Sequence, residues 1–255
     1  MSNNRWNLKG KNALVTGGTK GIGKAIVREF IDLGANVFTV ARDEKGLASL
    51  VEEMSDSNQI DGLPADVSKL SDRIRIIDTI KQKWDRLDIL VNNVGVNIRK
   101  KTPEYSVEEY DHIMETNLRA AFELCRLVFP LLKKSEQGNI INVSSTAGLT
   151  HIRTGAIYGM TKAALIQLTK NLAAEWAEYN IRVNAVAPWY IETPLVKPVL
   201  KDPDYFKEVI SRTPMKKIGK PADVAGAVSF LCMPASAHIT GHCIPVDGGF
   251  MINGF

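Results

Sequence analysis

Short β-branched runs alternate with longer helical patterns along the whole chain, and no linker interrupts the alternation. The strand-like runs are 12–16, 36–41, 87–92, 139–144, 181–187 and 242–246. The helical candidates between them are 23–33, 44–54, 71–84, 107–133, 156–179 and 221–232. Most of the strand-like runs are almost continuously apolar, which is typical of strands buried on both faces of a parallel sheet. The alternation predicts an α/β fold with a doubly wound parallel sheet, built as a single domain over 1–255.

The stretch 192–220 departs from this alternation. It is rich in proline and shows no clean helical or strand period. Proline fixes φ and removes a backbone donor, so regular elements in such a stretch are short. We predict that 192–220 forms a small lid or helical excursion on the single domain.

The charge balance of the chain is nearly even, because 32 Lys and Arg face 28 Asp and Glu and leave a net charge of +4. That balance does not suit a protein that binds nucleic acid through bulk charge. No apolar run approaches the roughly 18 residues needed to cross a membrane, and 1–10 contain no signal core. The 3 cysteines are widely spaced, which favours a reducing compartment. We predict a cytoplasmic protein that binds neither nucleic acid nor membranes.

A glycine cluster follows the first strand-like run and opens the first helical pattern. Gly17, Gly21 and Gly23 let the backbone turn sharply, and the helix N-terminus offers N–H groups to a phosphate. The spacing is only an approximate match to the common G-x-G-x-x-G pattern of dinucleotide sites. Residues 18–24 also match the start of a nucleoside triphosphate loop, but Ala25 stands where that loop needs Ser or Thr. We therefore interpret the cluster as a phosphate-binding loop without triphosphatase chemistry.

Tyr158 and Lys162 are four residues apart within a helical pattern, so both side chains emerge on one face. An adjacent ammonium favours the phenolate and is predicted to lower the pKa of the tyrosine, which makes it a usable acid and base near neutrality. This spacing is common on ordinary helix surfaces. The hydroxyl-rich turn at Ser144 and Ser145, together with the glycine cluster upstream, favours a catalytic interpretation.

Together these elements resemble the short-chain dehydrogenase/reductase family. The matching residues span nearly the whole chain and are Thr16-Gly17-x-x-x-Gly21-Ile22-Gly23, Asn92-Asn93-Val94-Gly95, Ser145, Tyr158-x-x-x-Lys162 and Val246-Asp247-Gly248-Gly249. Residues 5–10, 92–100 and the final Gly254-Phe255 are similar to the tropinone reductase-like group in particular. The resemblance implies a Rossmann-type fold and hydride transfer with a nicotinamide cofactor.

The resemblance also implies a role for each catalytic residue. Tyr158 acts as general acid in carbonyl reduction and as general base in alcohol oxidation, while Ser145 stabilises the charge on the substrate oxygen. Lys162 lowers the pKa of the tyrosine and holds the ribose of the nicotinamide. Asn117 matches the position that holds a proton-relay water. Taken alone, Asn117 would instead be interpreted as a kink or cap within the long helical pattern.

The end of the second strand-like run favours NADP(H) over NAD(H). NAD enzymes commonly place a carboxylate there, whereas Arg42 stands at this point and Lys20 adds a second cation. Asp43 follows directly and keeps the NAD(H) alternative open, although it can also serve as the N-cap of the next helix. The predicted cofactor contacts are Gly17, Thr19, Lys20, Gly21, Ile22, Gly23, Arg42, Asp66, Val67, Asn93, Gly95, Tyr158, Lys162, Pro188, Ile191 and Thr193.

The substrate pocket is predicted to be largely apolar and to take a ketone or secondary alcohol of moderate size. Its residues are Val96, Ser145, Ile152, Tyr158, Trp189, Tyr190 and Leu195. The family's usual Pro-Gly reads Pro188-Trp189 here, so we expect the indole to narrow the pocket near the nicotinamide. A non-catalytic dinucleotide sensor is the main alternative from another class, and it would be expected to have lost Ser145, Tyr158 or Lys162.

Two further expectations concern partners and metals. The resemblance implies a homodimer or homotetramer that pairs the helical patterns 107–133 and 156–179, whose apolar positions include Phe122, Leu127, Leu165 and Leu172. His238, His242 and Cys243 have the types of side chain that bind metals. We nevertheless predict no metal site there.

Overall fold

The structure is a computed structural model that describes residues 4–54 and 59–253; Gly254 and Phe255 lie outside the described residues. The strands are β1 (Asn12–Thr16), β2 (Asn36–Ala41), β3 (Ile60–Pro64), β4 (Ile89–Asn92), β5 (Gly138–Val143), β6 (Ile181–Pro188) and β7 (Cys243–Val246). The α-helices are α1 (Gly21–Asp32), α2 (Glu44–Glu53), α3 (Leu70–Trp84), α4 (Val107–Met114), α5 (Ala120–Leu132), α6 (Ala156–Trp176), α7 (Pro203–Arg212) and α8 (Pro221–Cys232).

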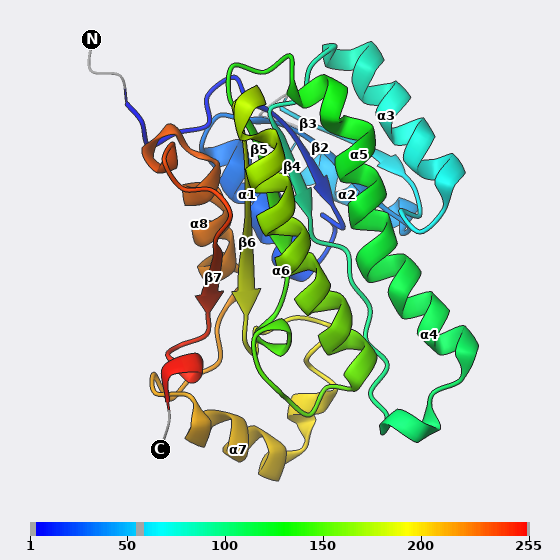
Figure 1. The fold of residues 1–255 in the computed structure, drawn as a ribbon, viewed down its shortest axis with the longest axis vertical. Helices are drawn as coiled ribbons and strands as arrows, with labels where there is room; N and C mark the ends of the chain where they lie inside the picture. Colours follow the sequence, from blue (N-terminus) through cyan, green and yellow to red (C-terminus); the bar gives the residue numbers. More distant parts are fainter. Residues whose placement is uncertain (1–3, 55–58, 254–255) are drawn as a thin grey trace.

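The strands form one parallel sheet in the order β3-β2-β1-β4-β5-β6-β7. β1 lies at the switch point of this order, because Val15 pairs with Thr39 of β2 on one side and with Val91 of β4 on the other. Figure 1 shows α7 at the end of the molecule toward which β6 and β7 point. In such sheets, ligands bind outside the carboxyl ends of the strands at the switch point. The predicted doubly wound Rossmann-type fold is confirmed.

Helices cover both faces of the sheet, so there is one apolar core on each face. Successive side chains of a strand point to opposite faces, and this decides which core a residue joins. Ala13 and Val15 of β1 pack with α1 and α8, whereas Leu14 between them packs with α3, α5 and α6. All three β1 side chains are fully buried. A strand buried on both faces needs apolar residues at consecutive positions, which explains the continuous apolar runs in the sequence.

The structure differs from the sequence prediction at two elements. β3 was not predicted, because Asp61, Gly62 and Pro64 break its apolar pattern; it pairs only with β2 and is an edge strand, where such residues are tolerated. The helix predicted over 107–133 is interrupted by a π-helical turn over Glu115–Arg119, between α4 and α5. Such turns are rare and often occur at functional sites.

The segment 192–220 contains a short 3-10 turn and α7, with irregular chain on either side. Backbone hydrogen bonds from residues 196–200 are all local, to Thr193 and Val196. Asp202 caps α7 by accepting from the backbone N–H of Asp204 at 3.0 Å. Among residues 4–54 and 59–253, no helix has both the length and the apolar character that a membrane crossing needs.

Candidate active site

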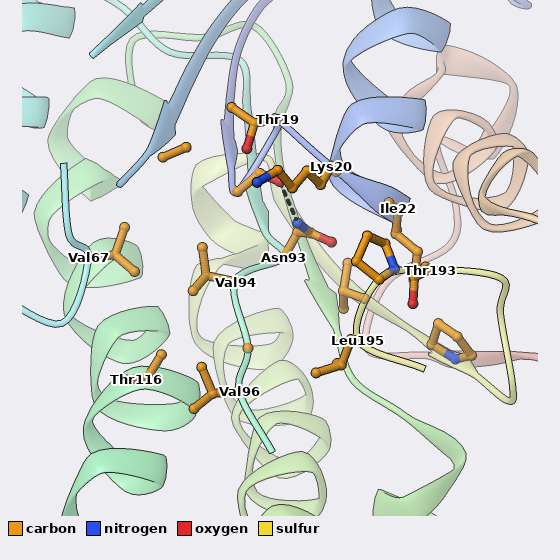
Figure 2. Close-up of a pocket in the computed structure, with 18 of the residues that line it drawn as sticks. Thr19, Lys20, Ile22, Val67, Asn93, Val94, Val96, Thr116, Thr193 and Leu195 are labelled. Atoms are coloured by element: carbon orange, nitrogen blue, oxygen red, sulfur yellow. Dashed lines mark hydrogen bonds between the residues drawn. The ribbon is translucent and has the colours of Figure 1, made fainter. Parts of the chain in front are cut away.

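A cavity of about 650 Å³ opens at the carboxyl ends of β1, β2, β4, β5 and β6. Every predicted cofactor contact lines this cavity, from the glycine loop to Thr193. Figure 2 shows Thr19 and Lys20 on one side of it and Thr193 and Leu195 on another. The volume lies within the range of small-molecule and cofactor sites.

The glycine loop at the entrance of α1 needs its glycines for two different reasons. Gly17 and Gly21 have φ values of +73° and +55°, which other residues rarely adopt. A Cβ on Gly23 would lie 2.1 Å from the carbonyl oxygen of Gly17, so only glycine allows the loop to fold back on the helix. No side chain caps the N-terminus of α1, so its first N–H groups are available to an anion such as a phosphate.

Asn93 joins the glycine loop to the end of β4. Its amide nitrogen donates to the carbonyl of Thr16 at 2.9 Å, and its backbone N–H donates to the Thr16 hydroxyl at 3.0 Å. In Figure 2, Asn93 lies directly beneath the loop that carries Thr19 and Lys20. Thr16 is a positioning residue that sequence reasoning gave no role, although it directly precedes the first glycine.

Two cations lie at the end of β2, where the ribose end of a dinucleotide binds in this type of fold. Lys20 forms a 2.8 Å ion pair with Asp43, and this contact lowers the pKa of the Asp43 carboxyl. Asp43 also accepts from the backbone N–H of Gly46, so it is the predicted N-cap of α2. Arg42 is exposed and lines the cavity, where its charge helps to lower the pKa of Asp66.

Tyr158 and Lys162 lie on the buried face of the first turns of α6. Lys162 is only 3% exposed, and its ammonium donates to the carbonyl of Val143 at 2.9 Å. Its Nζ lies 5.5 Å from the centre of the Tyr158 ring. Burial lowers the pKa of Lys162 to about 8.

That Lys162 lowers the pKa of Tyr158 stays a prediction. Burial raises the pKa of the Tyr158 phenol above its ordinary value, and the opposing influences are a hydrogen bond with Ser145 and the charge of Arg99. The physical reason is that the lysine and the tyrosine share one desolvated site, which disfavours both charged forms. Arg99 was not predicted to act on the tyrosine; it follows the Asn-Asn-Val-Gly motif by only a few residues.

Ser145 lies at the carboxyl end of β5 beside Tyr158. Its hydroxyl accepts from the backbone N–H of Ala147 at 3.1 Å and lies 3.5 Å from the carbonyl of Pro188. It is 8% exposed and lines the cavity. The hydroxyl is therefore held between two strand ends and can reach an atom bound next to the tyrosine.

Asn117 lies in the π-helical turn, where it is 1% exposed and does not line the cavity. Its side-chain oxygen accepts from the N–H of Val96 at 2.8 Å, and its amide donates to the Val96 carbonyl at 2.9 Å. The same amide lies 3.3 Å from the Thr161 hydroxyl. Asn117 thus holds the chain after β4 against α6, and its role in a proton relay stays a prediction.

The predicted substrate residues divide between two cavities. Val96, Trp189 and Leu195 line the cavity that holds Ser145 and Tyr158, whereas Ile152 and Tyr190 line a neighbouring cavity of about 270 Å³ beside α7. Trp189 borders both spaces. That all of these residues contact one substrate stays a prediction.

The site fits a dinucleotide on three observations: glycines that make room for it, a helix N-terminus without a side-chain cap, and cations at the ribose end. It offers little to a metal ion. Within the described ranges, no group of three or more His, Cys, Asp or Glu side chains is arranged to hold one. His238, His242 and Cys243 therefore form no such group.

Comparisons with known proteins agree with this geometry. A sequence model of a family described as enoyl-(acyl carrier protein) reductase matches residues 17–251. A tropinone reductase homolog of Arabidopsis thaliana is 50% identical over 253 residues, which cover 98% of this chain and 96% of the relative. Senescence-associated protein 13 of the same plant is 47% identical, with coverage of 99% and 94%.

Solved structures resemble the chain over almost its full length. A gluconate 5-dehydrogenase from Burkholderia cenocepacia, in complex with NADP and tartrate, superposes with a TM-score of 0.93 at 31% identity, covering 97% of this chain and 98% of that one. A 3-ketoacyl-(acyl-carrier-protein) reductase from Brucella melitensis, complexed with NADH, gives 0.87 at 34% identity, with coverage of 96% and 99%. The chain therefore belongs to the short-chain dehydrogenase/reductase family of oxidoreductases, within its tropinone reductase-like group.

Proposed function

We propose that this protein is an NADP(H)-dependent oxidoreductase that interconverts a ketone and a secondary alcohol. The observation that carries the proposal is the arrangement of Tyr158, Ser145 and Lys162 in one cavity with the glycine loop. A phenol and a serine hydroxyl that line one cavity can both bind one carbonyl oxygen. A sensor without catalytic function has no use for this arrangement.

Each residue of the arrangement has a distinct task. Ser145 donates to the carbonyl oxygen and polarises it, and Tyr158 delivers the proton that this oxygen acquires. Lys162, held by the carbonyl of Val143, supplies positive charge beside the ring of Tyr158. A nicotinamide bound in the cavity supplies the hydride when the carbonyl is reduced and accepts it when the alcohol is oxidised.

The preference for NADP(H) rests on the cations at the end of β2. Arg42 forms no ion pair among the described residues, so its guanidinium is available to a ribose phosphate. Asp43, the residue that favours NAD(H), already accepts hydrogen bonds from Lys20 and from the N–H of Gly46. The solved gluconate 5-dehydrogenase holds NADP, and the solved 3-ketoacyl reductase holds NADH.

Tyr158→Phe tests the proposed chemistry. We expect it to abolish ketone reduction because the phenol is the proton donor, while NADPH affinity stays within about twofold. Turnover is followed by NADPH absorbance over a panel of ketones, with NADH as the control for cofactor preference. Substantial turnover by the variant would reject the role of Tyr158. Equal rates with NADH and NADPH would reject the cofactor preference alone.

We also propose that the protein forms a homodimer or homotetramer through α5. Leu165 and Leu172 are buried in the core of the protomer, so they cannot take part in the pairing face. Phe122, in contrast, is 47% exposed and borders a groove with His112 and Leu168. Phe122→Asp should shift the mass measured by sedimentation toward the monomer; an unchanged mass would assign the contact to another face. The cytoplasmic location stays a prediction.

A further inference from the structure

The indole of Trp189 is held from several sides. The backbone N–H of Trp189 donates to the carbonyl of Val246 at 3.1 Å, just beyond the end of the β6–β7 pairing. Its ring lies parallel to that of Phe250, with centroids 3.6 Å apart and an interplanar angle of 6°. The indole Nε1 donates to the Thr213 hydroxyl at 3.1 Å, and the Tyr190 ring meets the indole edge to face at 4.6 Å.

The partners of the indole are themselves fixed to one another. Thr213 is 1% exposed and donates to the carbonyl of Val209 at 2.7 Å. Residues 247–253, the C-terminal segment, form hydrogen bonds with the end of α7 and the residues that follow it. Met215 N–H donates to the Gly248 carbonyl and the Asn253 amide to the Arg212 carbonyl, each at 3.1 Å. The indole therefore lies between two segments that cannot easily move apart.

Trp189 lines three cavities at once. One is the active-site cavity of about 650 Å³, and one is the space of about 270 Å³ beside α7 that Ile152 and Tyr190 also line. A third, of about 220 Å³, lies toward Met215 and Gly248. Among the described residues, Trp189 alone lines both the active-site cavity and either of the other two spaces, so it lies between the reacting centre and the space beside α7.

We propose that Trp189 sets the upper size limit of the substrate by closing the active-site cavity off from the space beside α7. This inference rests on the proposed ketone chemistry, since the cavity on the near side of the indole holds Ser145 and Tyr158. A side chain fixed by stacking and by a hydrogen bond excludes volume more strictly than a mobile one, because displacing it breaks both contacts.

The space beyond the indole is lined by aromatic rings and by charged side chains. The rings are those of Tyr190, Tyr205 and Phe250, and Arg153, Glu208 and Arg212 also line it. Arg153 lies over the Tyr205 ring at 5.1 Å and pairs with Glu208, which lies 3.9 Å from Arg212. A substrate ring that reaches this space can therefore pack on the aromatic side chains while the charges pair with one another.

The test compares two ketones, cyclohexanone and 4-phenylcyclohexanone, in the wild type and in Trp189→Gly. We expect the ratio of their kcat/KM values, aryl over unsubstituted, to rise at least tenfold in the variant, because a pocket discriminates by roughly 10–200-fold for a single methylene. NADPH affinity, measured by its fluorescence, should stay within about twofold. A folded variant with an unchanged ratio overturns the proposal.

Matched controls separate the size limit from a loss of structure. Trp6→Gly also removes an indole that stacks on a phenylalanine, Phe230 in α8, but Trp6 lines none of the cavities described above, so it should keep the wild-type ratio. Should Trp189→Gly not fold, Trp189→Leu keeps an apolar side chain of smaller volume. An unchanged ratio in Trp189→Leu also overturns the proposal.

Failure of the proposed function gives a different result. A wild type that reduces neither ketone rejects the ketone chemistry. The size limit is then read from the NADPH fluorescence change on titration with 4-phenylcyclohexanone. Tighter binding of this ketone to Trp189→Gly than to the wild type supports the size limit, and equal binding rejects it.

Discussion

The two halves of the active-site cavity are built in different ways. The cofactor half is formed by the ends of β1, β2 and β4, and it is fixed by hydrogen bonds to the backbone, such as the one from the Asn93 side-chain amide to the carbonyl of Thr16. The substrate half is formed by side chains from distant segments, with Trp189 meeting Phe250 and Thr213. In the cofactor half, glycines let the backbone approach a phosphate closely. In the substrate half, the sizes of the side chains in this chain set the shape of the space.

The two halves should therefore tolerate amino-acid substitution to different degrees. A Cβ at Gly23 would collide with backbone, so the cofactor half permits little change. The substrate half lies in loops and near a terminus, where substitution alters shape without breaking the sheet. Changes in the cofactor half should therefore affect cofactor affinity alone, while changes in the substrate half should leave that affinity intact. Residues shared by both halves should affect turnover most.

Ser145→Ala should have a large effect on turnover, because Ser145 lies where the halves meet. Loss of its donor to the carbonyl oxygen is expected to lower kcat by about 10²–10³-fold, as for other donors to developing charge. NADPH affinity should change by less than about twofold. Steady-state rates and NADPH fluorescence measure the two effects; a large loss of NADPH affinity would place Ser145 in the cofactor half instead.

Arg42→Ala should weaken NADPH binding by about 10–100-fold, because hydrogen bonds to charged groups contribute roughly 1.5–3 kcal/mol. NADH binding should not change, since NADH lacks the 2′-phosphate on its adenosine ribose. Arg75→Ala removes an exposed arginine on α3 and serves as the matched control. Equal weakening of both cofactors would mean that Arg42 acts on the fold of the site and not on the phosphate.

Lys162→Met should stabilise the protein while it abolishes turnover. Burial lowers the folded-state pKa of Lys162 from 10.5 to about 8, so the folded state binds fewer protons than the unfolded state between these pH values. The cost of the buried ammonium is full below pH 8 and disappears as the pH rises toward 10.5. At pH 7 we expect the variant to be about 1–3 kcal/mol more stable by denaturant unfolding, with the difference shrinking at higher pH.

A variant that is less stable than the wild type at pH 7 would contradict this account of Lys162. It would mean that the hydrogen bond to the Val143 carbonyl outweighs the desolvation of the ammonium. The loss of turnover would be unaffected by that outcome. The experiment therefore separates the contribution of Lys162 to folding from its contribution to chemistry.

Thr213→Val should have the smallest effect, about 1 kcal/mol of stability, because it removes one neutral acceptor from the Trp189 indole. Thr79→Val is the matched control, since Thr79 in α3 also donates to the carbonyl four residues earlier but meets no indole. NADPH affinity should be equal in both variants. A larger loss of NADPH affinity in Thr213→Val than in Thr79→Val would show that the substrate half also supports cofactor binding, which would contradict the comparison.

The residues predicted for the cofactor half lie together around one cavity, and the sequence could indicate this because the signals are local. The glycines, Asn93 and Arg42 each follow a strand directly, and parallel strands bring their ends to one edge. β3 was missed because an edge strand tolerates the Gly62 and Pro64 that break its pattern. The π-helical turn at Asn117 was not predicted because its residues have no amino-acid pattern that distinguishes them from an α-helix.

The substrate half could not be predicted to the same degree. Ile152 and Tyr190 were assigned to the pocket that holds Tyr158, whereas they line the space beside α7, which Trp189 also borders. The contact of Trp189 with Phe250 joins residues that are far apart in the sequence, and no periodicity indicates it. The upward effect of burial on the pKa of Tyr158 depends on the packed site and not on the spacing to a lysine.

The most direct test of the account uses an α,β-unsaturated ketone, cyclohex-2-enone, and NADPH carrying deuterium at both C4 positions of the nicotinamide. Mass spectrometry and NMR locate the deuterium in the product. The proposed role of Tyr158 and Ser145 predicts cyclohex-2-enol with deuterium on the carbinol carbon, and no such product from Tyr158→Phe. Cyclohexanone with deuterium on the β-carbon would show reduction of the alkene and would contradict the account.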